Sequence, residues 1–236
     1  MRELTIDAMN KIAAGSGSAE RRNSGEGLLI ALMGLPGCGK STTAKALSQL
    51  VPNSRLFPEP EEEQWPPAVL KRHRFGYFTA ITWFRSMRVP LLYMAHQQRS
   101  LGGIGIVDSY YDKLIADYID HPEMKWLIPP SDDYFPVLRE LALLDRQLLP
   151  NADCVVFLRV TQDQWRHFLS TRQRDMDSEA SFLEGFATQE TLLIAAQSFT
   201  KRSGAHLLLY DQQIGSAEST AEAVKNNLEA DGIPVR

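Results

Sequence analysis

The residue range 28–47 constrains the fold most, because a continuous apolar run there changes into a glycine-rich loop. Gly34, Gly39, Lys40 and Ser41 match the spacing G-x-x-x-x-G-K-[ST]. The apolar run before the loop predicts a strand, and the pattern after it predicts a helix. A chance glycine turn is the alternative, but the strand and helix on either side favour a loop that holds a chain of phosphates.

The chemistry of this loop follows from its residue types. Glycines let the backbone turn its N–H groups inward, and the following helix adds the positive end of its dipole. We expect Lys40 to be a solvated side chain that reaches the outer phosphates, and the Ser41 hydroxyl to bind Mg²⁺. The residues expected to bind the nucleotide are Gly34, Gly37, Cys38, Gly39, Lys40, Ser41 and Thr42.

Composition limits the kind of protein further. The chain has 236 residues, 44% of them hydrophobic, which suits one core-forming domain with appendages. A net charge of -4 and a pI near 5.8 give no reason to expect a nucleic-acid polymer or a membrane as partner. Without a long apolar run or a signal peptide, the cytoplasm is the expected location. Cys38 and Cys154 are expected to be packing or loop residues.

Short apolar runs alternate with longer helical patterns along the chain, which predicts an α/β fold of three layers with a parallel five-stranded sheet. Residues 1–27 are rich in small and polar residues and are expected to form a flexible extension before a domain over residues 28–236. The strands are expected at residues 28–33, 54–57, 103–107, 154–160 and 206–210, an irregular insertion at 121–136, and a lid near 169–180.

Two carboxylates are expected at the carboxyl edge of the sheet, where ligands of open α/β folds bind. Glu59 follows the second strand between two prolines, and this rigid placement suits a catalytic base. The neighbouring run 61–63 is better explained as a solvated acidic face. Asp108 ends the third strand, where it could hold Mg²⁺ or a substrate hydroxyl, or simply cap a helix.

Two arginines lie in the expected lid. Arg172 and Arg174 follow the helix behind the fourth strand, and they could close over a transferring phosphoryl group and stabilise its charge. The alternative is an ordinary solvated helix end.

Taken in order, these features resemble the deoxynucleoside kinase and thymidylate kinase group of P-loop phosphotransferases, over about residues 28–210. The segments that carry the resemblance are "GLPGCGKST" (34–42), "EPEEEQW" (59–65), "FGYFTAITWFR" (75–85), and "LPNADCVVFLRV" (149–160) followed by "RQRDMDSE" (172–179). The resemblance implies the strand order 2-3-1-4-5, Glu59 as the base, and an aromatic helix that lines the acceptor pocket. The acceptor candidates are Trp65, Tyr77, Trp83, Arg85 and Asp108.

Two departures from the family pattern fall on the acceptor side. Gly76 stands where those kinases usually carry a glutamine, and Ser109 where an arginine usually follows the acidic residue. The resemblance therefore supports transfer of the ATP γ-phosphoryl group, with Mg²⁺, better than it supports one acceptor. A nucleoside, a nucleoside monophosphate and another hydroxylated small molecule are the candidates, in that order.

A regulatory module that binds ATP or GTP and hydrolyses it slowly, or not at all, is the competing interpretation. It is weakened because the chain has neither the Asn-Lys-x-Asp motif of G proteins nor the apolar strand ending in two acidic residues that marks ATPase motors. The sequence leaves a homodimer open.

Overall fold

The structure is a computed structural model that describes residues 26–172 and 179–235, with the backbone alone for Arg172 and residues 179–184. The expected N-terminal extension up to residue 25 and the middle of the expected lid lie outside the described residues.

A five-stranded sheet forms the centre of the molecule, and all of its strand pairs are parallel. The strand order β2-β3-β1-β4-β5 confirms the expected order, and each strand starts and ends within one residue of its prediction. The strands are β1 (Leu28–Gly34), β2 (Ser54–Phe57), β3 (Ile104–Val107), β4 (Cys154–Arg159) and β5 (His206–Asp211).

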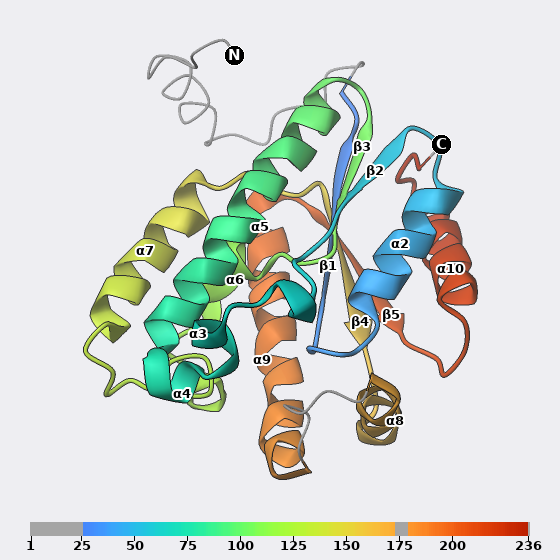
Figure 1. Ribbon diagram of the computed structural model, residues 1–236. Helices are drawn as coiled ribbons and strands as arrows, with labels where there is room; N and C mark the ends of the chain where they lie inside the picture. Colours follow the sequence, from blue (N-terminus) through green and yellow to red (C-terminus); the bar gives the residue numbers. More distant parts are fainter. Residues whose placement is uncertain (1–25, 173–178, 236) are drawn as a thin grey trace, which may run out of the picture.

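Helices cover both faces of the sheet, as a parallel sheet requires. Figure 1 shows α2 and α10 on one face, and α5, α6 and α9 on the other with α7 outside α6. The longer helices are α2 (Lys40–Leu50), α5 (Tyr77–Ser100), α6 (Tyr111–Tyr118), α7 (Phe135–Leu148), α8 (Gln162–Arg172), α9 (Glu179–Ser203) and α10 (Ala217–Ala230). The short ones are the 3₁₀ helices Glu62–Gln64 and Pro122–Met124, α3 (Pro67–Leu70) and α4 (Arg72–Phe75).

The core is centred on β1, whose seven residues are all buried because neighbouring strands lie on both sides and helices on both faces. Cys38 and Cys154 are buried in the same core, as expected for packing residues. Since all strands run the same way, their carboxyl ends lie at one edge of the sheet. The glycine loop, Glu59 and Asp108 therefore meet there.

The segment expected as an irregular insertion, residues 121–136, contains one short 3₁₀ helix and then enters α7 at Phe135. Within the described ranges, no helix combines the length and the apolarity needed to cross a bilayer.

Candidate active site

The glycine loop between β1 and α2 has a backbone that only glycine adopts easily. Gly34 has φ 141° and Gly39 has φ 92°, both in the left-handed half of the map. A Cβ on Gly34 would lie 2.6 Å from the Leu158 carbonyl oxygen, and one on Gly39 would lie 2.9 Å from Nε2 of Gln212. Side chains at these positions would fill the cradle, so the structure explains why the spacing of glycines is needed.

Contacts from distant elements hold this loop from outside. Nε1 of Trp165, on α8, donates to the Pro36 carbonyl oxygen at 2.8 Å. Gln212, just after β5, donates from Nε2 to the Cys38 carbonyl oxygen at 3.2 Å and accepts from the Thr220 hydroxyl at 3.0 Å. The loop is therefore shaped before any nucleotide binds.

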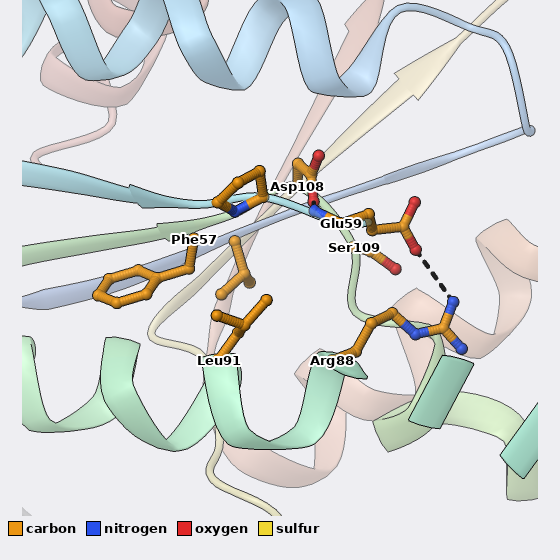
Figure 2. A pocket seen from close by; sticks show the side chains of 8 residues that line it. Phe57, Glu59, Arg88, Leu91, Asp108 and Ser109 are labelled. Atoms are coloured by element: carbon orange, nitrogen blue, oxygen red, sulfur yellow. Dashed lines mark hydrogen bonds and ion pairs between the residues drawn. The ribbon is translucent and has the colours of Figure 1, made fainter. Parts of the chain in front are cut away.

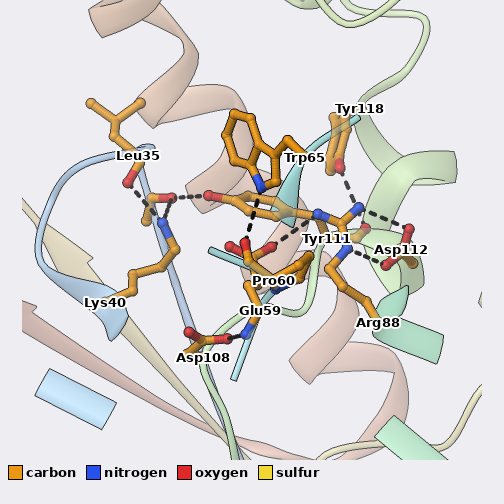
Figure 3. A network of polar contacts seen from close by, with 11 residues as sticks. Leu35, Lys40, Glu59, Pro60, Trp65, Arg88, Asp108, Tyr111, Asp112 and Tyr118 are labelled. Carbon is orange, nitrogen blue, oxygen red and sulfur yellow. Dashed lines mark hydrogen bonds and ion pairs between the residues drawn. The ribbon is translucent and has the colours of Figure 1, made fainter. Parts of the chain in front are cut away.

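Lys40 is buried, so the expectation of a solvated lysine is wrong. Only 6% of the residue is exposed, and Nζ donates to the carbonyl oxygens of Leu35 (2.8 Å) and Gly34 (3.3 Å). The Tyr111 hydroxyl also donates to the Gly34 oxygen at 2.6 Å, with Nζ of Lys40 5.3 Å from the centre of the Tyr111 ring (Figure 3). Burial lowers the pKa of Lys40, but the nearby polar groups, Glu59 among them, raise it on balance. The side chain keeps its charge inside the loop.

The two expected carboxylates are joined directly. The backbone N–H of Glu59 donates to Oδ1 of Asp108 at 2.7 Å, and Asp108 is 2% exposed. The alternative of a helix cap is not what the structure shows, because Tyr110 is the N-cap of α6 and no side chain caps it. Burial, and then the charge of Glu59, raise the pKa of Asp108 to about 6, while a hydrogen bond with the Ser41 hydroxyl opposes this shift.

Arg88, on α5, connects Glu59 to the helical layer, and the sequence analysis missed it. Its Nη1 donates to Oε1 of Glu59 at 3.0 Å, while Nε and Nη2 donate to the two oxygens of Asp112 at 2.7 and 3.0 Å (Figure 3). Burial raises the pKa of Glu59, but the charges of Arg88 and Lys40 outweigh it, so the pKa lies below its usual value. Glu59 is therefore an ionised carboxylate at neutral pH.

A small pocket lies beside this ion pair. Figure 2 shows Glu59, Arg88, Asp108 and Ser109 along its wall, with the apolar side chains of Phe57 and Leu91 nearby. Ser109 stands where the resembled kinases carry an arginine, and here the guanidinium that reaches Glu59 comes from α5 instead.

The structure brings one of the expected aromatic residues to Glu59. Trp65 donates from Nε1 to the Pro60 carbonyl oxygen at 3.0 Å, and its ring meets Phe84 edge-on at 5.1 Å. The guanidinium of Arg88 lies 5.3 Å from the centre of the same Phe84 ring, so Trp65, Phe84 and Arg88 form one wall beside Glu59. Trp83 packs against Phe84 at 5.0 Å and is half-buried.

The other expected acceptor residues are placed differently. Tyr77 is half-buried at the start of α5. Arg85 points its fork at Asp145 of α7, with two hydrogen bonds of 2.6 Å each, and is not joined to Glu59. Its assignment to the acceptor site stays a prediction, as does that of Trp83 and Tyr77.

Of the lid arginines, Arg172 is the last residue of α8, and Arg174 lies outside the described residues. Their role stays a prediction. The acidic run behaves as the solvated face that was expected, with Glu61 and Glu63 exposed around a short 3₁₀ helix.

The donors present fit a hard cation such as Mg²⁺. Ser41 offers a hydroxyl and Asp108 a carboxylate, which are the oxygen ligands that Mg²⁺ prefers. The raised pKa of Asp108 reflects two adjacent buried carboxylates, a charge that a cation would offset. The described residues contain no cluster of three or more His, Cys, Asp or Glu, so the remaining ligands would be phosphate oxygens and water.

Comparison with known proteins places the fold. No family model matches the chain, and no curated protein matches it by sequence. Among solved structures, thymidylate kinase from Candida albicans matches with a TM-score of 0.56 at 19% identity, over 89% of this chain and 95% of that one. Deoxyadenosine kinase from M. mycoides with bound dATP matches with a TM-score of 0.54 at 19% identity, over 86% of this chain and 99% of that one.

The fold is that of P-loop nucleoside and nucleotide kinases. The likeness extends to the same M. mycoides enzyme with bound dCTP, with a TM-score of 0.52 at 20% identity, over 86% of this chain and 100% of that one. At these identities the comparison concerns the arrangement of helices and strands. The activity of this nucleotide kinase-like chain has to be argued from its own residues.

Proposed function

We propose that this protein is an ATP-dependent phosphotransferase that moves the γ-phosphoryl group to a small acceptor. The observation that carries the proposal is the joining of Glu59 to Asp108, beside the glycine loop and Lys40 (Figure 3). A module that only binds nucleotide has no use for an ionised carboxylate held beside a pocket next to that loop. A transferase needs one to take the acceptor proton.

On the donor side, the glycine loop would hold the phosphates through its N–H groups. Lys40 would exchange the carbonyl oxygens of Leu35 and Gly34 for phosphate oxygens, which requires a change of side-chain torsions only. Ser41 and Asp108 would hold Mg²⁺, whose charge offsets that of the triphosphate.

On the acceptor side, Glu59 would accept the proton of the acceptor hydroxyl as that oxygen attacks the γ-phosphorus. The bond between the γ-phosphorus and its bridging oxygen breaks, and ADP leaves with the electron pair. Arg88 keeps Glu59 ionised and oriented for this step. Arg172 and Arg174 would stabilise the charge that spreads over the transferring group.

The acceptor classes keep the order given above, with a nucleoside or nucleoside monophosphate first. The fold likeness to enzymes of both kinds supports this choice. Thermal shift with a non-hydrolysable ATP analogue and Mg²⁺, against deoxynucleosides, their monophosphates and other hydroxylated metabolites, tests it, because a ligand that binds only the folded state raises the unfolding temperature. Each stabilising acceptor is then assayed for ADP release. If none supports turnover, the transferase proposal fails in favour of a binding module.

A further inference from the structure

Arg72 and Trp126 meet on the acceptor side, outside the network already described. The guanidinium carbon of Arg72, on α4, lies 5.8 Å from the centre of the Trp126 ring. The chain reaches α4 from Glu59, and it reaches Trp126 from Asp108 through α6. Figure 1 shows α4 at the end of α5 that lies at the carboxyl edge of the sheet. The pair therefore stands at the same end of the molecule as the candidate active site.

Arg72 is a half-buried cation without an acidic partner. No ion pair or hydrogen bond is made by its guanidinium within residues 26–172 and 179–235. Burial lowers the pKa of Arg72, and only Tyr77 opposes the shift. A partly desolvated guanidinium that lacks an anion is costly for the folded state, which indicates that an anion from outside the chain would be bound favourably.

Trp126 adds a second donor without an acceptor. Its Nε1 is buried, and in the described part of the chain no hydrogen-bond acceptor reaches it. An indole N–H can only donate, and buried donors almost always have a partner. Arg72 and Trp126 thus present donors side by side from two separate segments.

The surroundings are mainly basic. Arg72 lies in the run 71–74, "KRHR", in which the other three side chains are exposed. Lys125 is exposed next to Trp126, and Glu123 is the acidic side chain nearest to it in sequence. This local excess of positive charge attracts anions.

We propose that Arg72 and Trp126 bind a phosphate-type oxyanion, and that its source is the phosphate of the acceptor. The assignment of the source rests on the proposed function, whereas the oxyanion site itself does not. A nucleoside monophosphate, rather than a nucleoside, would then be the acceptor class. Guanidinium and indole N–H groups supply charge-assisted hydrogen bonds of the kind that recognise phosphate oxygens.

The alternative is a purely structural contact, in which the cation lies over the ring and fastens α4 to the segment after α6. Two variants separate the explanations. Trp126→Phe keeps an aromatic ring beneath the cation and removes the N–H, while Arg72→Gln removes the charge. Arg74→Gln is a matched control, because it removes the same charge from an exposed neighbour in the same helix.

Calorimetric titration of the full chain without ATP uses inorganic phosphate, thymidine and thymidine monophosphate as probes. We expect Trp126→Phe and Arg72→Gln to weaken binding of the monophosphate by about 10-fold or more, with thymidine affinity and Arg74→Gln unchanged. Since no turnover is measured, an inactive protein would refute the proposed function without touching this result.

Three outcomes overturn the inference. Unchanged affinity for all probes in both variants, with a lower unfolding temperature, would show that the contact is structural. Equal weakening in Arg74→Gln would show a general charge effect. Weakening for inorganic phosphate but not for thymidine monophosphate would keep the oxyanion site and overturn the acceptor as its source.

Discussion

The donor and acceptor sides of the candidate site are held by different kinds of contact. On the donor side, neutral groups of Trp165 and Gln212 donate to backbone carbonyl oxygens of the glycine loop. On the acceptor side, Arg88 and Arg85 form ion pairs with carboxylates that lie 24 to 60 residues away in sequence.

The difference has a consequence for function. A loop shaped by its own backbone keeps its form while surrounding side chains change. A site shaped by ion pairs between helices changes when a single charged residue moves. Phosphate binding can therefore persist in a fold like this one while the acceptor varies, as the exchange of an arginine for Ser109 illustrates.

The largest expected effect lies on the donor side, at Lys40. Lys40→Met should lower turnover by about 10³-fold and weaken binding of an ATP analogue, because the charge on the phosphates loses its partner. The loss of the bonds to Leu35 and Gly34 should also cost about 1–3 kcal/mol of stability. Lys45→Met, an exposed change on the same helix, is the control for activity and unfolding. Normal affinity for the analogue in Lys40→Met would contradict the donor assignment.

Next in size is the loss of the base. Glu59→Gln should leave nucleotide and acceptor binding intact and lower turnover by about 100-fold or more, since the amide cannot take the proton. Glu61→Gln and Glu63→Gln, on the exposed acidic face, should be as active as the parent. Steady-state kinetics and calorimetry separate the two effects, and an active Glu59→Gln would remove Glu59 from catalysis.

A smaller effect is expected at Arg88. Arg88→Lys keeps the charge but loses the fork that spans Glu59 and Asp112, so kcat should fall by about 10-fold while affinity for the ATP analogue stays unchanged. Arg85→Lys sharpens the comparison. Its ion pair with Asp145 predicts a loss of stability alone, whereas a raised KM for the acceptor would favour the sequence-based assignment of Arg85. A loss of donor affinity in Arg88→Lys would show that the two sides are not separate.

At Gly39 the expected change is mainly one of stability. Gly39→Ala should destabilise the protein by about 1–2 kcal/mol through its positive φ and weaken ATP-analogue binding through the contact with Gln212. Gly204→Ala is the matched control, since Gly204 also has a positive φ but nothing within 4 Å of its Cβ position. Equal unfolding free energies and unchanged analogue binding in both variants would show that only backbone strain matters.

The smallest effect is a pH dependence on the acceptor side. Burial, helped by the charge of Arg202, lowers the pKa of Lys113 to about 8 from 10.5. Between these values the unfolded chain binds more protons, so the free energy of unfolding should rise with pH from about 8 to 10.5. Urea unfolding of the wild type and of Lys113→Met over this range isolates the slope, because Lys113→Met lacks it. An identical pH dependence in the two proteins would contradict the shift.

Local spacing in the sequence was enough to predict much of this protein. The glycine loop follows from residues 34–41, because a phosphate-binding turn needs glycines at fixed positions between a strand and a helix. The five strands follow from their apolar runs. Glu59 and Asp108 could be expected together because each comes directly after a strand, and parallel strands end at one edge.

Tertiary structure alone decided which charged residues meet. Arg85 and Arg88 lie one turn apart on α5, and no local signal says that Arg88 reaches Glu59 while Arg85 reaches Asp145. The same holds for Lys40, which is drawn back onto loop carbonyls beneath Tyr111, and for Arg72 beside Trp126. A turn or a strand is encoded by neighbours in sequence. An ion pair between helices depends on how those helices pack, and their packing is set by the whole core.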